Sequence, residues 1–226
     1  MSNQIPIKLK SIYDEFDNCP RCKKEKNNLN HILGGGKFKN PKFLFLFINP
    51  TYHNISSHKN YPGNKRYPFI GVRYFWKLFT EVGFINKDII DDIYGNGWQT
   101  EHENRIENNL VESGIYISNL VKCTQPHPVN PTRDVIEQDL PLLKEEIKIV
   151  NPKYIIAFGK LTIKIITGLD VRLNNYLNDI EIGKYKALKS INILDKYYKV
   201  LPCFFPVGRG NPLKALKTLK YIKANY

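Results

Sequence analysis

The sequence predicts an α/β fold, a three-layer sandwich in which helices cover both faces of a central, mostly parallel, four-stranded sheet. Two observations support this prediction. Short apolar runs alternate along the chain with segments of helical spacing, which is typical of parallel sheets covered on both faces. The 226 residues are 42% hydrophobic, enough to bury a substantial core, and we expect one domain over residues 1–226.

The first half of the chain contains two predicted strands. Residues 4–17 have the pattern of a short helix, and the run KFLFLFI at 42–48 is continuously apolar, as expected for a strand buried on both faces. Residues 68–84 contain apolar side chains at helical spacing. We interpret the polar, glycine-containing stretch at 91–109 as a surface excursion, and GIYISNLVKC at 114–123 as the second strand.

The second half of the chain continues the alternation. A helix is predicted over residues 132–150, with acidic residues near its start. The third strand is KYIIAFG at 153–159, and the fourth is YYKVLPCFFP at 197–206. Residues 170–196 between them are weakly patterned. A terminal helix is predicted over residues 211–226, because a proline stands near its first turn.

Polar residues and glycines follow all four predicted strands. Parallel strands end at the same edge of a sheet, and ligands of such folds bind outside the C-terminal ends of the strands. We therefore expect one site formed by residues 49–53, 119–124, 159 onward and 205–211.

The charge of the chain favours a polyanionic partner. Thirty-four Lys and Arg residues against 21 Asp and Glu residues leave a formal net charge of +13. Such an excess suits nucleic acid; a general bias toward Lys is the alternative explanation. No apolar stretch reaches the roughly 18 residues of a membrane span, and the first residues lack the apolar region of a signal peptide. We expect a cytoplasmic protein with no membrane partner.

The four cysteines are Cys19, Cys22, Cys123 and Cys203. In a reducing compartment, a C-x-x-C pair such as that in DNCPRCKK is more often a metal or redox site than a disulfide. The chain has neither a second C-x-x-C nor a His pair at zinc-finger spacing, so the pair alone does not define a complete zinc site.

Four segments in order resemble the uracil-DNA glycosylase superfamily, most closely its iron–sulfur branches. They are FINPT at 47–51, whose Asn-Pro is closer to the mismatch-specific branch, YPFIGVRYFWKLFTEVGF at 67–84, the block from YISNLVKC to IIAFGK at 116–160, and VLPCFFPVGRGNP at 200–212. The resemblance implies this α/β sandwich and a DNA base-excision repair glycosylase. Such an enzyme flips a deaminated base out of the DNA and hydrolyses its N-glycosidic bond without a lyase step. Uracil is the base that we expect first.

The resemblance assigns catalytic residues at the end of the first strand. Asn49 stands at the water-activating position, where an amide orients water but does not stabilise positive charge as a carboxylate does. Without the resemblance, Asn49 reads as a turn residue before proline. The last motif departs from the family, because Phe205 stands where a histidine is usual and cannot hydrogen-bond the leaving base. His53 is the candidate that compensates; a histidine on a surface loop is the alternative.

The resemblance also assigns residues that bind substrate. Phe69 would stack on the flipped base, although its local pattern also suits a core residue. Asn119 follows an apolar strand, and its amide would pair with adjacent acceptor and donor groups of uracil. The other residues expected at the base are Ile48, Thr51, Tyr52 and Phe205, with backbone amides near Thr51 and Tyr52 as donors. Arg209 and Lys160 are expected to contact DNA.

By the same resemblance, Cys19, Cys22 and Cys123 match three ligands of an iron–sulfur cluster. The family's fourth ligand is a cysteine sixteen residues after the third, and this chain has Asp139 there. A carboxylate oxygen can complete a thiolate set, so a [4Fe–4S] cluster held by these four residues is expected. Zinc and a metal-free site are the alternatives.

Two other functions stay open at this point. One is a glycosylase for another base, such as hypoxanthine or mismatched thymine, because Asn49 and Phe205 both change the pocket. The other is a catalytically weak or inactive DNA-binding member that retains the fold and the metal site. The expected partner in each case is DNA, bound by a monomer.

Overall fold

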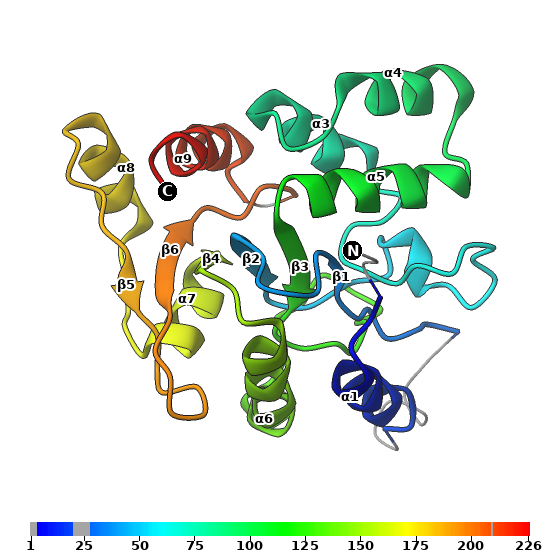
Figure 1. The fold of residues 1–226 in the computed structure, drawn as a ribbon, viewed down its shortest axis with the longest axis horizontal. Helices are drawn as coiled ribbons and strands as arrows, with labels where there is room; N and C mark the ends of the chain where they lie inside the picture. Colours follow the sequence, from blue (N-terminus) through cyan, green and yellow to red (C-terminus); the bar gives the residue numbers. More distant parts are fainter. Residues whose placement is uncertain (1–3, 20–27, 209) are drawn as a thin grey trace.

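The computed structural model describes residues 4–19, 28–208 and 210–226. Its centre is a six-stranded sheet in the order β1-β3-β2-β4-β6-β5 (Figure 1). The four inner strands are mutually parallel: β3 (Ile115–Asn119), β2 (Phe43–Phe47), β4 (Tyr154–Phe158) and β6 (Lys199–Cys203). The edge strands β1 (Gly35–Gly36) and β5 (Leu188–Lys189) are antiparallel. The predicted mostly parallel sheet is confirmed, with two short strands added at its edges.

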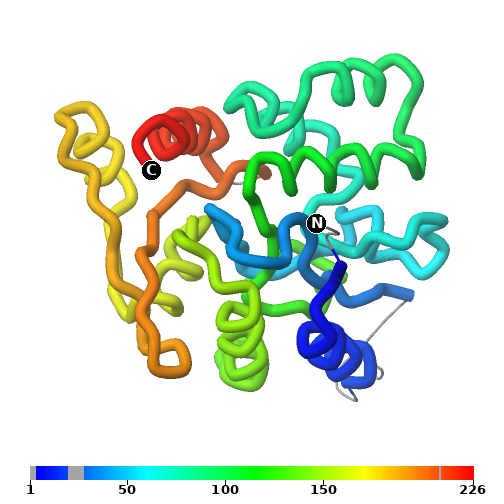
Figure 2. The backbone as a smooth tube through the Cα atoms, in the orientation of Figure 1, coloured from blue at the N-terminus to red at the C-terminus, as the bar shows by residue number. Residues whose placement is uncertain are grey.

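Helices cover both faces of this sheet (Figure 1). One layer contains α3 (Arg73–Val82), α4 (Lys87–Asn96), α5 (Glu101–Glu112) and α9 (Pro212–Asn225). The other contains α1 (Ile7–Asp17), α6 (Arg133–Val150) and α7 (Lys160–Thr167). Helix α8 (Leu173–Glu181) lies near α9 beside the β5 edge, as the tube in Figure 2 shows. In the described ranges, no helix combines the length and the apolar character that crossing a bilayer requires.

The central strand β2 is buried on both faces, as its sequence predicts. Phe43, Phe45 and Phe47 pack in the hydrophobic cluster beneath α3, α4, α5 and α9. Leu44 and Leu46 pack in the cluster on the opposite face. All five side chains have an exposed fraction of 1% or less. The continuous apolar run therefore reflects a strand that contributes to two cores at once.

The interpretation of residues 91–109 as a surface excursion is wrong. The segment belongs to helices α4 and α5, and their apolar residues at helical spacing are buried in the core: Ile89, Ile90, Ile93, Ile106 and Leu110. Buried polar residues on α5, namely His102, Glu103 and Asn109, share this inner face. Polar residues on a buried face weaken the hydrophobic periodicity from which a core helix is predicted.

The edge strands were not predicted, because two residues are too few to show a pattern. Strand β1 lies in a glycine-rich connector. Gly36 has φ +91, and a Cβ at this position would collide with the Ile115 carbonyl oxygen of the neighbouring strand. Glycine is therefore required where β1 approaches β3. Strand β5, like α8, lies in the weakly patterned residues 170–196.

Helix α5 also holds the long loop that follows β2. The buried Glu103 carboxylate accepts hydrogen bonds from the Tyr61 hydroxyl at 2.6 Å, the Asn64 N–H at 3.2 Å and the Lys65 N–H at 3.4 Å. Burial and the neighbouring carboxylate raise the pKa of Tyr61, which keeps its hydroxyl a donor. These hydrogen bonds fix the course of the loop at residues 61–65.

Replacing Glu103 by alanine is expected to destabilise the fold by roughly 1–3 kcal/mol, because it leaves three partly buried hydrogen bonds without their acceptor. Urea unfolding followed by circular dichroism measures this change. The matched control is Glu112→Ala, an exposed position on the same helix, for which we expect a change within about 0.5 kcal/mol. Equal losses in the two variants would contradict this role of Glu103.

Candidate active site

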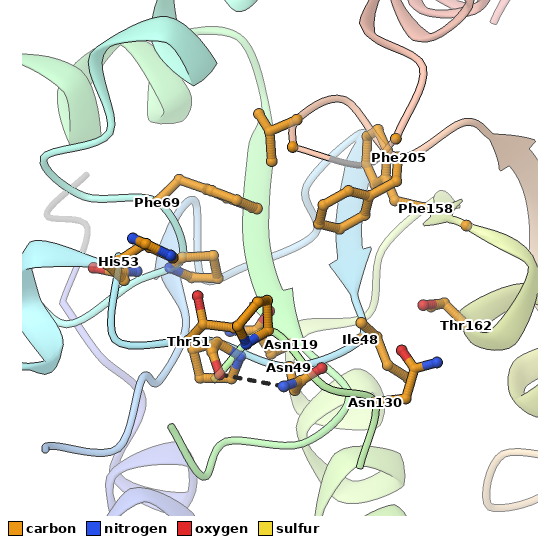
Figure 3. A pocket seen from close by; sticks show the side chains of 18 of the residues that line it. Ile48, Asn49, Thr51, His53, Phe69, Asn119, Asn130, Phe158, Thr162 and Phe205 are labelled. Carbon is orange, nitrogen blue, oxygen red and sulfur yellow. Dashed lines mark hydrogen bonds between the residues drawn. The ribbon is translucent and has the colours of Figure 1, made fainter. Parts of the chain in front are cut away.

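A cavity of about 580 Å³ opens where the four parallel strands end (Figure 3). Its lining includes residues from each predicted strand end: Ile48, Asn49, Thr51, Asn119, Gly159, Lys160, Phe205 and Val207. The predicted convergence of the four strand ends is confirmed. In Figure 3, Phe69 lies on one side of the cavity and Phe158 and Phe205 on the other, with Asn49 and Asn119 nearby.

Strand register places two of the predicted residues together. Phe47 of β2 pairs with Asn119 of β3. The pairing continues past the strands, because the N–H groups of Leu120 and Val121 donate to the carbonyls of Phe47 and Ile48 at 2.7 and 2.9 Å. Asn49 follows directly, so both asparagines line the same cavity.

The Asn49 side chain has a defined orientation. Its Nδ2 donates to the carbonyl oxygens of Pro50 and Val129, each at 3.3 Å. Within the part of the chain that the structure describes, no hydrogen bond is donated to Oδ1. An amide whose nitrogen is bound to the backbone in this way presents its oxygen as an acceptor for a water molecule.

The prediction that the backbone amide of Tyr52 contacts the base is wrong. This N–H donates to the Gln125 carbonyl at 3.0 Å, and the Gln125 N–H donates to the Pro50 carbonyl at 3.0 Å. The Tyr52 ring is 40% exposed and does not line the cavity. Thr51 does line it. The Tyr52 N–H, which was expected to face the base, therefore pairs with the segment after β3 instead.

Phe69 adopts a left-handed backbone conformation, with φ +64. This conformation costs a residue other than glycine roughly 1–3 kcal/mol, and such strain is concentrated at functional sites. Two hydrogen bonds to the Phe69 carbonyl hold it, from the Trp76 indole at 3.0 Å and the Val72 N–H at 2.8 Å. The ring stacks on Phe75 with centroids 4.0 Å apart and is half-buried at the cavity. A core phenylalanine would not need this backbone, which favours a role in binding.

Asn119 has an unpaired donor in the cavity wall. Its side chain is 1% exposed, and among the described residues its Nδ2 has no hydrogen-bond partner. Burying an amide N–H without a hydrogen-bond partner costs a free energy comparable to that of a hydrogen bond. A ligand with an acceptor at this point would recover that loss.

The wall opposite Phe69 is apolar. The Phe205 ring lies 6.0 Å from the Phe47 ring and 6.2 Å from the Phe69 ring, between centroids. Phe158 stacks on Phe47 at 4.3 Å. His53 lines the cavity as an exposed residue, with its ring 3.9 Å from that of Tyr52. His53 is thus the imidazole of the cavity lining.

The start of α7 borders the cavity. Lys160 is exposed there, and Thr162 is 1% exposed with an Oγ1 that has no partner in the described structure. The sequence did not single out Thr162, because one threonine at a helix start carries no distinctive pattern. Free N–H groups in the first turn of a helix favour anions. Arg209, the other residue expected at DNA, lies outside the described residues.

The described metal-ligand candidates, Cys19, Cys123 and Asp139, belong to the side of the sheet that α1 and α6 cover. Cys19 and the buried Cys123 pack in the same hydrophobic cluster. The buried Asp139 accepts a hydrogen bond from the N–H of Lys122, the residue before Cys123, at 3.3 Å. None of these three side chains lines the cavity. Cys22 lies outside the described residues.

The donor types fit a thiolate-rich site. Two cysteine sulfurs and one carboxylate, as thiolates and an oxygen ligand, suit an iron–sulfur cluster with one oxygen ligand, or tetrahedral zinc. Cys123 is disulfide-bonded in this structure. A metal binds a cysteine as its thiolate, so a metal at Cys123 requires that this disulfide be reduced.

Comparisons with known proteins agree with this architecture. The family model described as the uracil DNA glycosylase superfamily matches residues 34–224. Among curated proteins, the type-4 uracil-DNA glycosylase of Pyrobaculum aerophilum is 36% identical over 32% of the chain and 37% of the relative. The enzymes of the same name from Saccharolobus solfataricus and Sulfurisphaera tokodaii are 29% and 27% identical over 67% and 70% of the chain. Of these two relatives the chain covers 56% and 57%, and so spans about half the length of the curated relatives it matches.

The strain at Phe69 predicts that glycine at this position is more stable than alanine, the reverse of the usual order within a strand. Phe69→Gly is expected to be more stable than Phe69→Ala by about 1 kcal/mol, because glycine adopts φ +64 without a clash. Thermal and urea unfolding of the two variants measure the difference. The control pair is Phe158→Gly and Phe158→Ala within β4, where alanine should be the more stable by roughly 0.5–1 kcal/mol. The same order at both positions would contradict the strain.

Proposed function

The chain belongs to the uracil DNA glycosylase superfamily, and we propose that it is a DNA N-glycosylase that removes uracil by hydrolysis. One observation carries the proposal. A strained phenylalanine and an unpaired buried amide line the same cavity, at the ends of the parallel strands. The first suits the face of a flipped base, and the second suits an acceptor on its edge.

Recognition of the base would use Phe69 and Asn119. The Phe69 ring stacks on any flat base, so it contributes to affinity but does not distinguish one base from another. The Asn119 Nδ2 would donate to the O4 carbonyl oxygen of uracil, and its Oδ1 would accept from the adjacent N3–H. Cytosine presents the opposite donor and acceptor at these two atoms, so an oriented amide would reject it.

Hydrolysis would use a water molecule oriented by Asn49. Cleavage of a glycosidic bond passes through an oxocarbenium-like state, and the water must attack the sugar carbon from the side opposite the base. Asn49 presents Oδ1 as an acceptor because its nitrogen is bound to Pro50 and Val129. The bond between base and sugar breaks with its electron pair on the base, and the water adds to the carbon and releases a proton.

The leaving base would receive less help than is usual in the family. Phe205 has no donor, and His53 is the imidazole of the cavity lining that would stabilise the negative charge. Loss of one such donor costs roughly 100- to 1000-fold in comparable oxyanion sites. We therefore expect slow turnover, with Ile48 and Thr51 shaping the pocket around the base.

DNA would bind across the cavity mouth. Lys160 and the first turn of α7 would contact the phosphate backbone, with Arg209 as a further candidate. The net charge of +13 supports binding to a polyanion. We propose a monofunctional enzyme, because no lysine occupies a motif position for Schiff-base chemistry.

A [4Fe–4S] cluster held by Cys19, Cys22, Cys123 and Asp139 would serve as a cross-link between the chain after α1 and the chain after β3. The described ligands do not line the cavity, so no step at the base depends on the group.

The test of the function is a panel of oligonucleotides that carry uracil, hypoxanthine or a thymine mismatch. The products are resolved as abasic sites on a gel, and borohydride trapping reports any covalent adduct. Uracil excision without an adduct supports the proposal. Excision of hypoxanthine or thymine alone would move the substrate to that base. Binding of all the oligonucleotides without cleavage would indicate an inactive DNA-binding member.

Restoring the missing donor should accelerate excision. Phe205→His is expected to raise the single-turnover rate on uracil DNA by roughly 100-fold. Phe205→Leu is the matched control, because it removes the ring without adding a donor. A histidine variant no faster than the leucine variant would contradict a leaving-group role at this position.

Metal content follows from the ligand set. Protein purified without oxygen and with thiol reductant is expected to show a broad band near 400 nm and about four iron atoms per chain. Asp139→Ala should lower the iron content, whereas Cys203→Ala, at a buried cysteine distant from the set in the sequence, should not. Zinc without iron would change the metal, and protein without either would contradict a metal site.

A further inference from the structure

Lys122 is a buried cation whose three donors all have partners. Its side chain is 0% exposed. Its Nζ donates to the Ser118 hydroxyl at 2.6 Å, the Asn119 carbonyl at 2.6 Å and the Glu146 carboxylate at 2.5 Å. An ammonium has three donors, so this arrangement fully occupies it.

Glu146 fixes the other end of this network. It is 1% exposed, and its Oε1 accepts from the Tyr116 hydroxyl at 2.6 Å and from Ser118 at 2.8 Å. The Tyr116 hydroxyl also contacts the Tyr13 hydroxyl at 2.6 Å. Burial and the Glu146 charge raise the pKa of both tyrosines, which keeps their hydroxyls neutral. The network thus joins α1, β3 and α6.

Stability alone does not explain a charged pair at this place. Among the ion pairs that the described residues form, Lys122–Glu146 is the one with both side chains at 1% exposure or less. Removing two charges from water costs free energy that their attraction only partly returns, and apolar replacements of buried pairs are often as stable. A fixed geometry is what the pair adds.

The geometry concerns Asn119. Lys122 binds the carbonyl of this residue, which is the last of β3. The side chain of the same residue carries the unpaired Nδ2 in the cavity wall. An amide group whose Nδ2 has no partner in the described structure takes its direction from its backbone, and Lys122 holds the peptide that follows Asn119 from three residues away.

We propose that Lys122, anchored by Glu146, is a positioning residue that aims the Asn119 amide at the base edge. This inference rests on the proposed function of the cavity. Lys122 does not line the cavity and touches no substrate atom. Its effect is on the precision of base recognition, and an error of about 1 Å at such a contact can cost on the order of 100-fold in rate.

The test uses the double variant Lys122→Met with Glu146→Gln. It removes both charges, while the glutamine oxygen can still accept from Tyr116 and Ser118. The control is Ile147→Val, a buried position beside Glu146 on α6 that perturbs the same helix and leaves both Lys122 and Glu146 in place. Each protein is compared by melting temperature, by kcat and KM on uracil DNA, and by affinity for undamaged DNA.

The expected result is a 10- to 100-fold lower kcat for the double variant than for the control, on the order of the positioning effect above, with unchanged affinity for undamaged DNA. A kcat within twofold of the control would overturn the proposal. If the double variant does not fold, Glu146→Gln alone serves, since it is isosteric and loosens the anchor of Lys122.

A second readout does not need catalysis. The ¹⁵N side-chain amide signal of Asn119, assigned with Asn119→Asp, is followed while free uracil is added. In the native protein it should shift with uracil and not with cytosine, and in Glu146→Gln this selectivity should be lost. Equal selectivity in both proteins would refute the positioning role. No response in the native protein would instead contradict the proposed function of the cavity.

Discussion

The parallel pairing of β2 with β3 and β4 is the constraint on which the site depends. Phe47 lies opposite Asn119, and Leu46 lies opposite Ala157. A slip of one residue would turn every side chain of β2 to the opposite face, and the two cores that bury alternate residues of this strand forbid it. The register therefore determines that Asn49 and Asn119 reach the same cavity. The apolar run of β2, whose burial fixes this register, is also the clearest strand signal in the sequence.

Much of the fold was predictable for that reason. A strand buried on both faces is a continuous apolar run, and β2, β3, β4 and β6 all fall within the predicted runs. Helices α4 and α5 were missed because they bury polar side chains. The Glu103 carboxylate gains its hydrogen-bond donors only when the loop at residues 61–65 folds against it. Hydrogen bonds between distant segments leave no periodicity in a sequence. The two-residue edge strands leave none either.

The candidate site was predictable at its strand ends and not in its details. Asn49, Phe69, Asn119 and Phe205 line one cavity, as the strand-end argument and the family resemblance predict. The left-handed backbone of Phe69, the use of the Tyr52 amide by Gln125 and the burial of Lys122 are long-range consequences of folding. Two of these features break local rules, namely a bulky residue at positive φ and a buried charge, and the unpaired buried amide of Asn119 is a third departure. Such departures are expected where a structure is organised for binding.

The most direct measurement of the central claim is a crystal structure with DNA that carries 2′-fluoro-2′-deoxyuridine, whose glycosidic bond resists cleavage. We predict that the base leaves the DNA stack and enters the cavity, with its face on Phe69. A pyrimidine carbonyl oxygen should lie within hydrogen-bonding distance of the Asn119 Nδ2, and a water molecule should lie at the Asn49 Oδ1. A complex in which the uracil stays stacked and the DNA binds away from this cavity would contradict the account.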